Sequence, residues 1–377
     1  MTKGYIKGLD GLRAIAICWV MFGHISSSLN WPVTAWYQKP FVILSNTGWV
    51  GVQLFFVISG FLITGILLKG LGQKHQLRNF YIRRSLRIFP VYYLTLFFFF
   101  IALPLFSATP NWLNGASENQ LWYWLYLQNW IRPFTDSGGF SPLWSLAIEE
   151  QYYLVWPLLV LKLNAKTLIR VCLFMVISAP IFRVLLFYIF PDSLGGQDIG
   201  KGAAYAFTFA RWDAIAFGSL LALLGYKKDW PKFLVKYSKL CLVIVTMIVV
   251  IQIAYFHNFS AVNEGLTLLN QTTAGLLFFL VVFIVYYQKN TWLIKCLEFP
   301  LMKYIGKYSY AMYLFHLPIV IIWIDFFVPE FSGLHPVVAL CLLFAHYFSL
   351  LGITFLLAML SWNILEHPFL KIKKRFA

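Results

Sequence analysis

Two polar side chains that could do chemistry, Arg13 and His24, lie in one apolar stretch over residues 9–29. They are eleven residues apart, about three turns of a helix, so both side chains share one face and lie about 16 Å apart along its axis. An imidazole can take a proton from a hydroxyl near neutral pH, and a guanidinium can hold a phosphate or a carbonyl oxygen. Because polar groups are costly inside a bilayer, their presence indicates function. The pair predicts chemistry that is reached from both sides of a membrane.

Each of these residues also has a structural interpretation. His24 could donate to a backbone carbonyl of a neighbouring helix, and Asp10, three residues before Arg13, could pair with that arginine. Such a pair would still leave guanidinium donors for a phosphate or for the carbonyl of a thioester. For His24 and for Arg13, the sequence therefore leaves both the structural and the catalytic interpretation open.

A third candidate is Glu149, which follows the start of the apolar run over 143–162. If this run enters the bilayer from the outer side, Glu149 lies about 9 Å deep and His24 about 8 Å deep, at 1.5 Å per residue. A carboxylate beside an imidazole orients the ring and favours its protonated form. We therefore expect Glu149 to pair with His24, although either Glu149 or Glu150 could instead pair with Arg183 or Arg211.

Two further motifs are suited to a donor molecule that carries phosphates. Arg83 and Arg87 are four residues apart and share a helix face. They could anchor the helix at the membrane surface, or clamp the phosphates of a nucleotide-bearing donor. In the preceding apolar run, Ser59 and Gly60 form a small pair at mid-membrane, which permits close helix packing or leaves a narrow passage.

The elements that position these residues must cross a membrane. Of the 377 residues, 60% are hydrophobic and 12% charged, and the mean hydropathy is +0.72, values that a soluble globule of this length cannot accommodate. We predict an all-α polytopic membrane protein with about ten transmembrane helices. The predicted spans are 9–29, 48–69, 88–107, 143–162, 168–190, 208–226, 237–256, 269–287, 308–328 and 336–365.

The connecting segments give the orientation. Most of the 30 lysines and arginines fall in alternate loops, which predicts that the N- and C-termini are cytoplasmic. The net charge of +16 follows from this topology and from contact with anionic membrane lipid, so no nucleic acid partner is expected. Residues 121–130, rich in Trp and Tyr, predict an interfacial or re-entrant helix. The outer loop 105–142 is rich in turn formers and could cover or admit a substrate.

No linker divides the chain, and the sequence predicts a single membrane domain over 1–377 with a basic cytoplasmic tail over 369–377. The five cysteines are scattered, so neither a disulfide framework nor a metal site is expected.

Five motifs occur in a specific order: Leu9-Asp-Gly-Leu-Arg13 with ten residues to His24, Phe55-Phe-Val-Ile-Ser-Gly-Phe-Leu-Ile63, Arg83-Arg-Ser-Leu-Arg87-Ile-Phe-Pro-Val-Tyr-Tyr93, Trp144-Ser-Leu-Ala-Ile-Glu149 and Tyr310-Ala-Met-Tyr-Leu-Phe-His316. Together they resemble the membrane acyltransferase-3 family, from about residue 5 to 368. Each motif alone is weak, whereas the ordered set is specific.

The resemblance implies an integral membrane O-acyltransferase in a bacterial-type inner or plasma membrane. Such an enzyme transfers an acyl group, usually acetyl, from cytoplasmic acyl-CoA to a sugar hydroxyl of a cell-surface or lipid-linked glycan. By this analogy His24 is the catalytic base or acyl relay and Arg13 is its partner, and we expect Glu149 to orient His24. The residues implied on the donor side are Arg83 and Arg87 at the CoA phosphates, with Ser59 and Gly60 along the acyl path.

Asp10, Tyr152 and His316 are expected to support this site, although His316 could also belong to a kinked packing site near Pro318. Some relatives carry an additional extracytoplasmic hydrolase-like domain. We therefore expect this chain either to complete the transfer alone or to use a separate extracytoplasmic partner. The alternative function is a transporter or flippase for a lipid-linked glycan, which predicts internal pseudo-symmetry.

Overall fold

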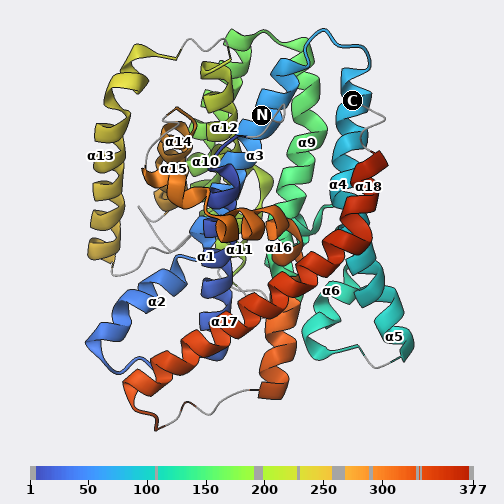
Figure 1. Ribbon diagram of the computed structural model, residues 1–377, viewed down its shortest axis with the longest axis vertical. Helices are drawn as coiled ribbons and strands as arrows, with labels where there is room; N and C mark the ends of the chain where they lie inside the picture. Colours follow the sequence, from blue (N-terminus) through green and yellow to red (C-terminus); the bar gives the residue numbers. More distant parts are fainter. Residues whose placement is uncertain are drawn as a thin grey trace. The chain divides into compact units, whose positions relative to one another are not determined.

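The computed structural model describes residues 6–106, 109–190, 198–226, 230–256, 268–287, 292–327, 331 and 333–372 (Figure 1). Within these residues the regular elements are all helices, which confirms the all-α prediction. The chain forms two compact units, unit 1 from residues 1–55 and 233–358 and unit 2 from residues 56–232 and 359–377. That they act as one domain stays a prediction.

Nine helical segments of the described residues are long and apolar enough to cross a membrane, which makes the chain a multi-pass membrane protein. They are Leu9–Leu29, Trp36–Lys69, Gln76–Phe106, Ala165–Ile189, Ile199–Leu224, Lys232–Ala254, Asn270–Tyr287, Pro300–Phe327 and Pro336–Ile372. The tenth predicted span, over 143–162, corresponds to α9 (Trp144–Lys162), which is not among these nine segments. Its 19 residues extend about 28 Å, but Glu149, Glu150 and Gln151 lower its mean hydropathy. The cytoplasmic placement of both termini stays a prediction.

Unit 1 is organised around α1 (Leu9–Leu29), which packs along α16 (Pro300–Phe327). Glycine makes this approach possible, because a Cβ atom on Gly306 would overlap the carbonyl of Asp10. A Cβ atom on Gly11 would likewise overlap the backbone of Leu297, at the end of α15. The other elements of this unit are η1 (Trp36–Gln38), α2 (Lys39–Asn46), the start of α3 (Trp49–Lys69), α13 (Lys232–Phe256) from residue 233, α14 (Asn270–Tyr287), α15 (Trp292–Leu297) and α17 (Pro336–Ser361) to residue 358.

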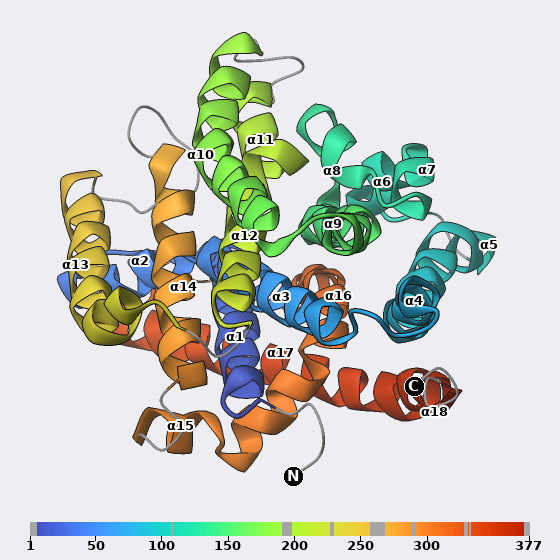
Figure 2. The ribbon, with the colours of Figure 1, turned by 90° about the horizontal axis from the view of Figure 1, so that it is seen from above.

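Unit 2 contains the rest of α3 and the helices up to α12. In this unit α10 packs against α12, and α18 lies beside α4 (Figure 2). Its long helices are α4 (Gln76–Phe97), α9 (Trp144–Lys162), α10 (Ala165–Ile189) and α12 (Thr208–Leu224). Its shorter elements are η2 (Phe98–Ala102), α5 (Leu103–Phe106), η3 (Asn111–Leu113), α6 (Asn114–Glu118), α7 (Gln120–Trp124), α8 (Gln128–Ile131), η4 (Arg132–Phe134), η5 (Gly138–Leu143), α11 (Ile199–Ala206), η7 (Trp362–Glu366) and α18 (His367–Ile372).

The small pair of α3 serves close helix packing. A Cβ atom on Gly60 would overlap the carbonyl of Ile215, and one on Gly218 would overlap the carbonyl of Val57. The backbones of α3 and α12 therefore touch at this level, which agrees with the packing interpretation of the pair. That Gly60 also lines an acyl path stays a prediction.

Three predicted elements differ from the structure. The helix predicted over 121–130 is instead two short helices, α7 and α8, because Tyr126 between them has a left-handed backbone with φ +55°. The span predicted to begin at residue 88 belongs to a helix that already begins at Gln76. The Arg and Leu residues between Gln76 and residue 88 have a high helix propensity and extend the helix in this direction. The last run, predicted over 336–365, is the helix α17 to Ser361 and continues as a π-helix over Trp362–Glu366. Residues 107–108 of the outer loop and 373–377 of the basic tail lie outside the described residues.

The core of unit 2 contains a buried ion pair. Arg183 Nη2 of α10 lies 3.0 Å from Asp213 Oδ2 of α12, and both side chains are fully buried. Arg183 Nη1 also donates to the carbonyl of Ala210. Arg183, which the sequence left as an alternative partner for Glu149, is thus held by α12.

This pair predicts a large effect on stability. Asp213→Ala leaves a guanidinium buried without its carboxylate, which is expected to lower the free energy of unfolding by about 3–5 kcal/mol. Thermal unfolding of the purified protein in detergent measures the change. The double substitution Arg183→Leu with Asp213→Leu removes both charges and should lose less stability than either single substitution. Equal melting temperatures of Asp213→Ala and the original protein would contradict the prediction.

Candidate active site

The histidine part of the site lies in unit 1, between α1 and α16. The ring centroids of His24 and His316 are 5.2 Å apart. His316 is fully buried, and its Nδ1 lies 2.6 Å from the carbonyl oxygen of Tyr313. Since a carbonyl oxygen can only accept, Nδ1 carries a proton, and Nε2 is the nitrogen that can gain or lose another. Among the residues described, Nε2 has no hydrogen-bond partner. The structure therefore places a second imidazole, which can accept a hydrogen bond through Nε2, next to His24.

The surroundings of His316 are aromatic. The Tyr313 ring lies 5.4 Å from the His316 ring and makes an edge contact with Phe55 at 6.0 Å. Pro318 is buried inside α16, two residues beyond His316, as the packing interpretation expected. Packing and hydrogen bonding are compatible here, because the packing fixes the ring while Nε2 keeps its lone pair.

Arg13 lies at the other end of α1. Its Nη1 is 3.3 Å from Asp10 Oδ1, and the two side chains are about one-fifth and one-quarter exposed. The pairing alternative raised by the sequence is therefore present. Because about three helical turns separate Arg13 from His24, the two residues act at different depths. Asp10 orients the guanidinium rather than the imidazole.

The carboxylate part of the site lies in unit 2, on α9. Tyr153 OH donates to Glu149 Oε2 over 3.1 Å, one turn along the same helix. The hydroxyl of Ser59 lies 2.7 Å from Tyr153 OH. Since the single phenolic proton points to Glu149, Ser59 donates to Tyr153, and the three side chains form a directed chain. Ser59, expected along an acyl path, thus belongs to the carboxylate site.

Arg84 completes this cluster and is the residue that sequence reasoning missed. Its guanidinium lies 4.1 Å from the centroid of the Tyr153 ring and within electrostatic range of Glu149 and Glu150. The sequence favoured Arg83 and Arg87 because they share a helix face. A signal was present in the Arg-Arg dipeptide, but only the packing of α4 identifies which arginine meets α9.

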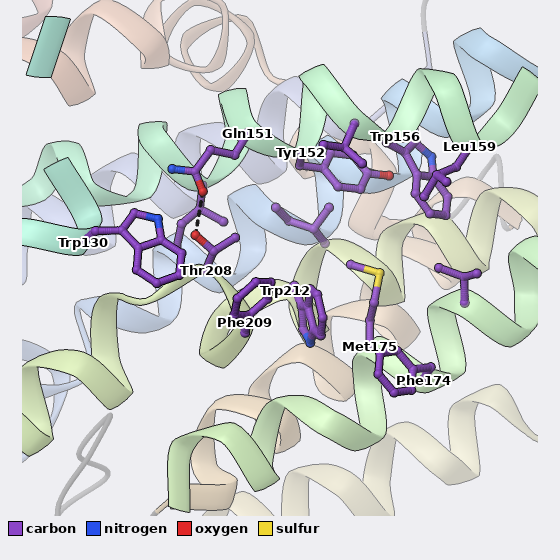
Figure 3. Close-up of a pocket in the computed structure, with 14 residues that line it drawn as sticks. Trp130, Gln151, Tyr152, Trp156, Leu159, Phe174, Met175, Thr208, Phe209 and Trp212 are labelled. Carbon is purple, nitrogen blue, oxygen red and sulfur yellow. Dashed lines mark hydrogen bonds between the residues drawn. The ribbon is translucent and has the colours of Figure 1, made fainter. Parts of the chain in front are cut away.

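Tyr152, one residue before Tyr153, has a different environment. Its hydroxyl lies 2.6 Å from Ser219 Oγ and 3.3 Å from Thr64 Oγ1. Its ring lines an apolar cavity of about 360 Å³ between α9, α10 and α12 (Figure 3). Thr208 and Gln151 meet there through a hydrogen bond of 2.6 Å. The aromatic lining suits hydrocarbon rather than the charged parts of a donor.

Arg211, the other alternative partner for Glu149, is enclosed by aromatic rings at the start of α9. It is fully buried, with its guanidinium carbon 4.8 Å from the Trp144 ring centroid and 5.0 Å from that of Tyr205. Such contacts stabilise a cation away from water. His24 belongs to unit 1 and Glu149 to unit 2, and their pairing stays a prediction.

Comparison with known proteins identifies the class of this chain. One family model, described as an acyltransferase domain, matches residues 6–363. This chain belongs to the acyltransferase-3 family. The match covers nearly the whole chain and confirms the acyltransferase class predicted from the ordered motifs. No solved structure matches the chain.

Several curated relatives are similar along almost the full chain. OatA of Listeria monocytogenes, named peptidoglycan O-acetyltransferase, is 28% identical in an alignment of 390 positions that covers 98% of this chain and 56% of OatA. YrhL of Bacillus subtilis, provisionally named as a peptidoglycan O-acetyltransferase, is 28% identical over 97% of this chain and 55% of YrhL. The chain thus spans little more than half the length of these relatives.

Proposed function

We propose that this protein is an O-acetyltransferase of a bacterial-type plasma membrane, which moves an acetyl group from acetyl-CoA on the cytoplasmic side to a sugar hydroxyl of a cell-envelope glycan. The observation that carries the proposal is the pair of imidazoles, His24 and His316, held 5.2 Å apart on two helices of an acyltransferase domain. The printed names of the relatives make peptidoglycan the first acceptor to test.

The reaction requires a base close to the acceptor hydroxyl. In the direct route, His24 takes the hydroxyl proton while the sugar oxygen attacks the thioester carbonyl. The carbon–sulfur bond then breaks, and the departing CoA sulfur takes the proton from the imidazolium. In the relay route, His24 first attacks the thioester and forms an acetyl-imidazole, which the sugar hydroxyl then cleaves. Both routes release CoA thiol and an acetyl ester.

His316 acts as a positioning residue in this proposal. Its Nδ1 proton is bound to the carbonyl of Tyr313, and its Nε2 has no partner among the described residues, so a turn of the His24 ring toward it would form a hydrogen bond from His24 to Nε2. Such a bond selects one tautomer of His24, and the nitrogen that faces the substrate keeps its lone pair. Glu149, if it reaches His24 as the sequence predicts, supplies the negative charge that stabilises the imidazolium.

Recognition of the donor gives a separate prediction. Arg83→Gln and Arg87→Gln are each expected to raise KM for acetyl-CoA about tenfold, because each removes a charge-assisted hydrogen bond to phosphate. Rates with a short acetyl thioester that lacks the nucleotide should not change. Arg78→Gln, an exposed position of the same helix, is the matched control. Equal losses with both thioesters would contradict a role of these arginines at the phosphates.

Transfer itself is tested in sealed membrane vesicles. Labelled acetyl-CoA is supplied on the cytoplasmic face, with peptidoglycan fragments on the other face, and label is followed into the glycan. Incorporation that depends on the protein supports the proposal. Passage of unmodified lipid-linked glycan without incorporation of label would indicate the flippase instead.

A further inference from the structure

Unit 2 contains a polar cavity that the donor chemistry does not use. It has a volume of about 210 Å³ and lies between η4, η5 and the start of α11. Its polar lining includes Arg132, Asp136, Ser141 and Asp198. The charge pattern of the loops predicts that these segments lie on the outer side of the membrane. We propose that this cavity is the subsite that binds one neutral sugar ring of the acceptor glycan, an inference that rests on the proposed function.

The side chains that line the cavity match the hydrogen-bonding needs of sugar hydroxyls. A hydroxyl both donates and accepts, so it bonds best where acceptors and donors stand close together. Asp136 and Asp198 supply carboxylate acceptors, whereas Arg132 supplies guanidinium donors. Lys201 lies outside the lining but pairs with Asp198, its Nζ 2.6 Å from Asp198 Oδ2. Together with Arg132 it balances the charge of the two carboxylates, which favours a neutral ring over an anion.

The same side chains are already held in place. Arg132 donates to Ser141 Oγ through Nε and Nη2, over 3.3 and 3.2 Å. Asp136 Oδ1 accepts from the backbone N–H of Gly138 at 2.9 Å, and Asp198 Oδ1 accepts from that of Lys201 at 3.0 Å. Because a preorganised site loses little conformational entropy on binding, these bonds favour a ligand over solvent.

The turn behind Asp136 also depends on glycine. Gly138 has φ +44°, a left-handed conformation, and a Cβ atom there would overlap the carbonyl of Trp112. A Cβ atom on Gly115 would likewise overlap the carbonyl of Asp136. The wall that carries the carboxylate is therefore fixed from behind by two close backbone contacts.

Two aromatic rings in contact, Tyr205 and Trp144, connect the cavity to the start of α9, the helix that carries Glu149. The guanidinium of Arg132 lies 5.2 Å from the centroid of the Tyr205 ring. That ring is 4.8 Å from the ring of Trp144, the first residue of α9. Glu149 follows five residues later, an axial rise of about 7.5 Å. A sugar in the cavity would thus sit at the end of the helix that carries Glu149, within unit 2.

Binding without donor provides the test. The full-length protein in lipid nanodiscs, free of acetyl-CoA, is titrated with a labelled soluble peptidoglycan disaccharide by equilibrium dialysis. Asp136→Asn and Arg132→Lys are each expected to weaken binding about tenfold, because each loses a charge-assisted hydrogen bond. The asparagine still accepts from Gly138 N–H, so its fold is retained. Glu118→Gln, an exposed carboxylate of the same loop, should bind as the original protein does.

The outcomes separate the subsite from the proposed function. In acetylation assays the same two variants should raise KM for the disaccharide about tenfold and leave KM for acetyl-CoA unchanged. Unchanged disaccharide binding in both variants would overturn the subsite, as would displacement of the disaccharide by inorganic phosphate. Binding by the original protein that depends on Asp136 and Arg132, without acetylation of any acceptor, would support the subsite and reject the proposed function.

Discussion

Replacing His24 with alanine is expected to lower the rate of acetyl transfer about a thousandfold or more, because the variant lacks both a general base and a nucleophile for the thioester. His316 is not expected to replace it, because this ring is fully buried, has its Nδ1 proton bound to a backbone carbonyl and has its centroid 5.2 Å from that of His24. The initial rate of label transfer from acetyl-CoA in vesicles measures the effect, at a protein level matched by immunoblot.

A second histidine of the same unit provides the matched control. His346 of α17 is also only partly exposed, and its Nδ1 accepts from Trp323 Nε1 at 3.0 Å. His346→Ala removes an imidazole from a membrane helix without touching the site and should transfer acetyl within about twofold of the original rate. Should His24→Ala keep more than about a tenth of the rate, neither the direct nor the relay route survives.

The same preparation distinguishes the two routes. Without an acceptor, the relay route traps label on the protein as an acetyl-imidazole, whereas the direct route leaves the protein unlabelled. Label that is stable to gel filtration and absent from His24→Ala indicates the relay. His316→Leu, which removes the hydrogen-bond acceptor, tests positioning: it should reduce kcat while leaving KM for acetyl-CoA unchanged, whereas His316→Gln, which keeps an acceptor, should retain more of kcat.

The spans of this fold could be predicted because each depends on local composition. The run over 9–29 matches α1 at both ends, since the glycine before it has a left-handed φ of +83° and the asparagine after it a φ of +47°. The stretch 121–130 could not be predicted, because Tyr126 adopts a left-handed conformation that ordinary residues avoid. Its cause lies in the packing around the loop rather than in the local pattern.

Only part of the candidate site could be predicted from the sequence, because helix packing decides which candidate residues come together. His24 and His316 were both candidates, yet 292 positions separate them, and they meet because glycines let α1 and α16 approach closely. Arg84 was missed because adjacent arginines look equivalent until one of them covers the ring of Tyr153. Composition identifies the residues that could do chemistry, whereas helix packing selects which of them share a site.

Glu149→Gln is expected to lower kcat about a hundredfold to a thousandfold, because it removes the charge that would stabilise the His24 imidazolium. The substitution is conservative in shape: the amide oxygen can still accept from Tyr153 OH, so the chain that runs from Ser59 through Tyr153 remains. KM for acetyl-CoA should stay within about twofold, since an interaction made in the transition state affects kcat rather than donor binding. Steady-state rates in nanodiscs measure both constants.

Tyr153→Phe separates the charge of Glu149 from its orientation. This variant keeps the carboxylate but removes its hydrogen-bond donor, so it should lose only about tenfold in kcat. The ring that Arg84 covers is retained, which preserves the cation–π contact. If Tyr153→Phe lost as much activity as Glu149→Gln, orientation rather than charge would be the contribution of this carboxylate. If Glu149→Gln kept the original kcat with an unchanged melting temperature, the carboxylate of α9 would have no part in catalysis, and the stabilising charge would have to come from another residue.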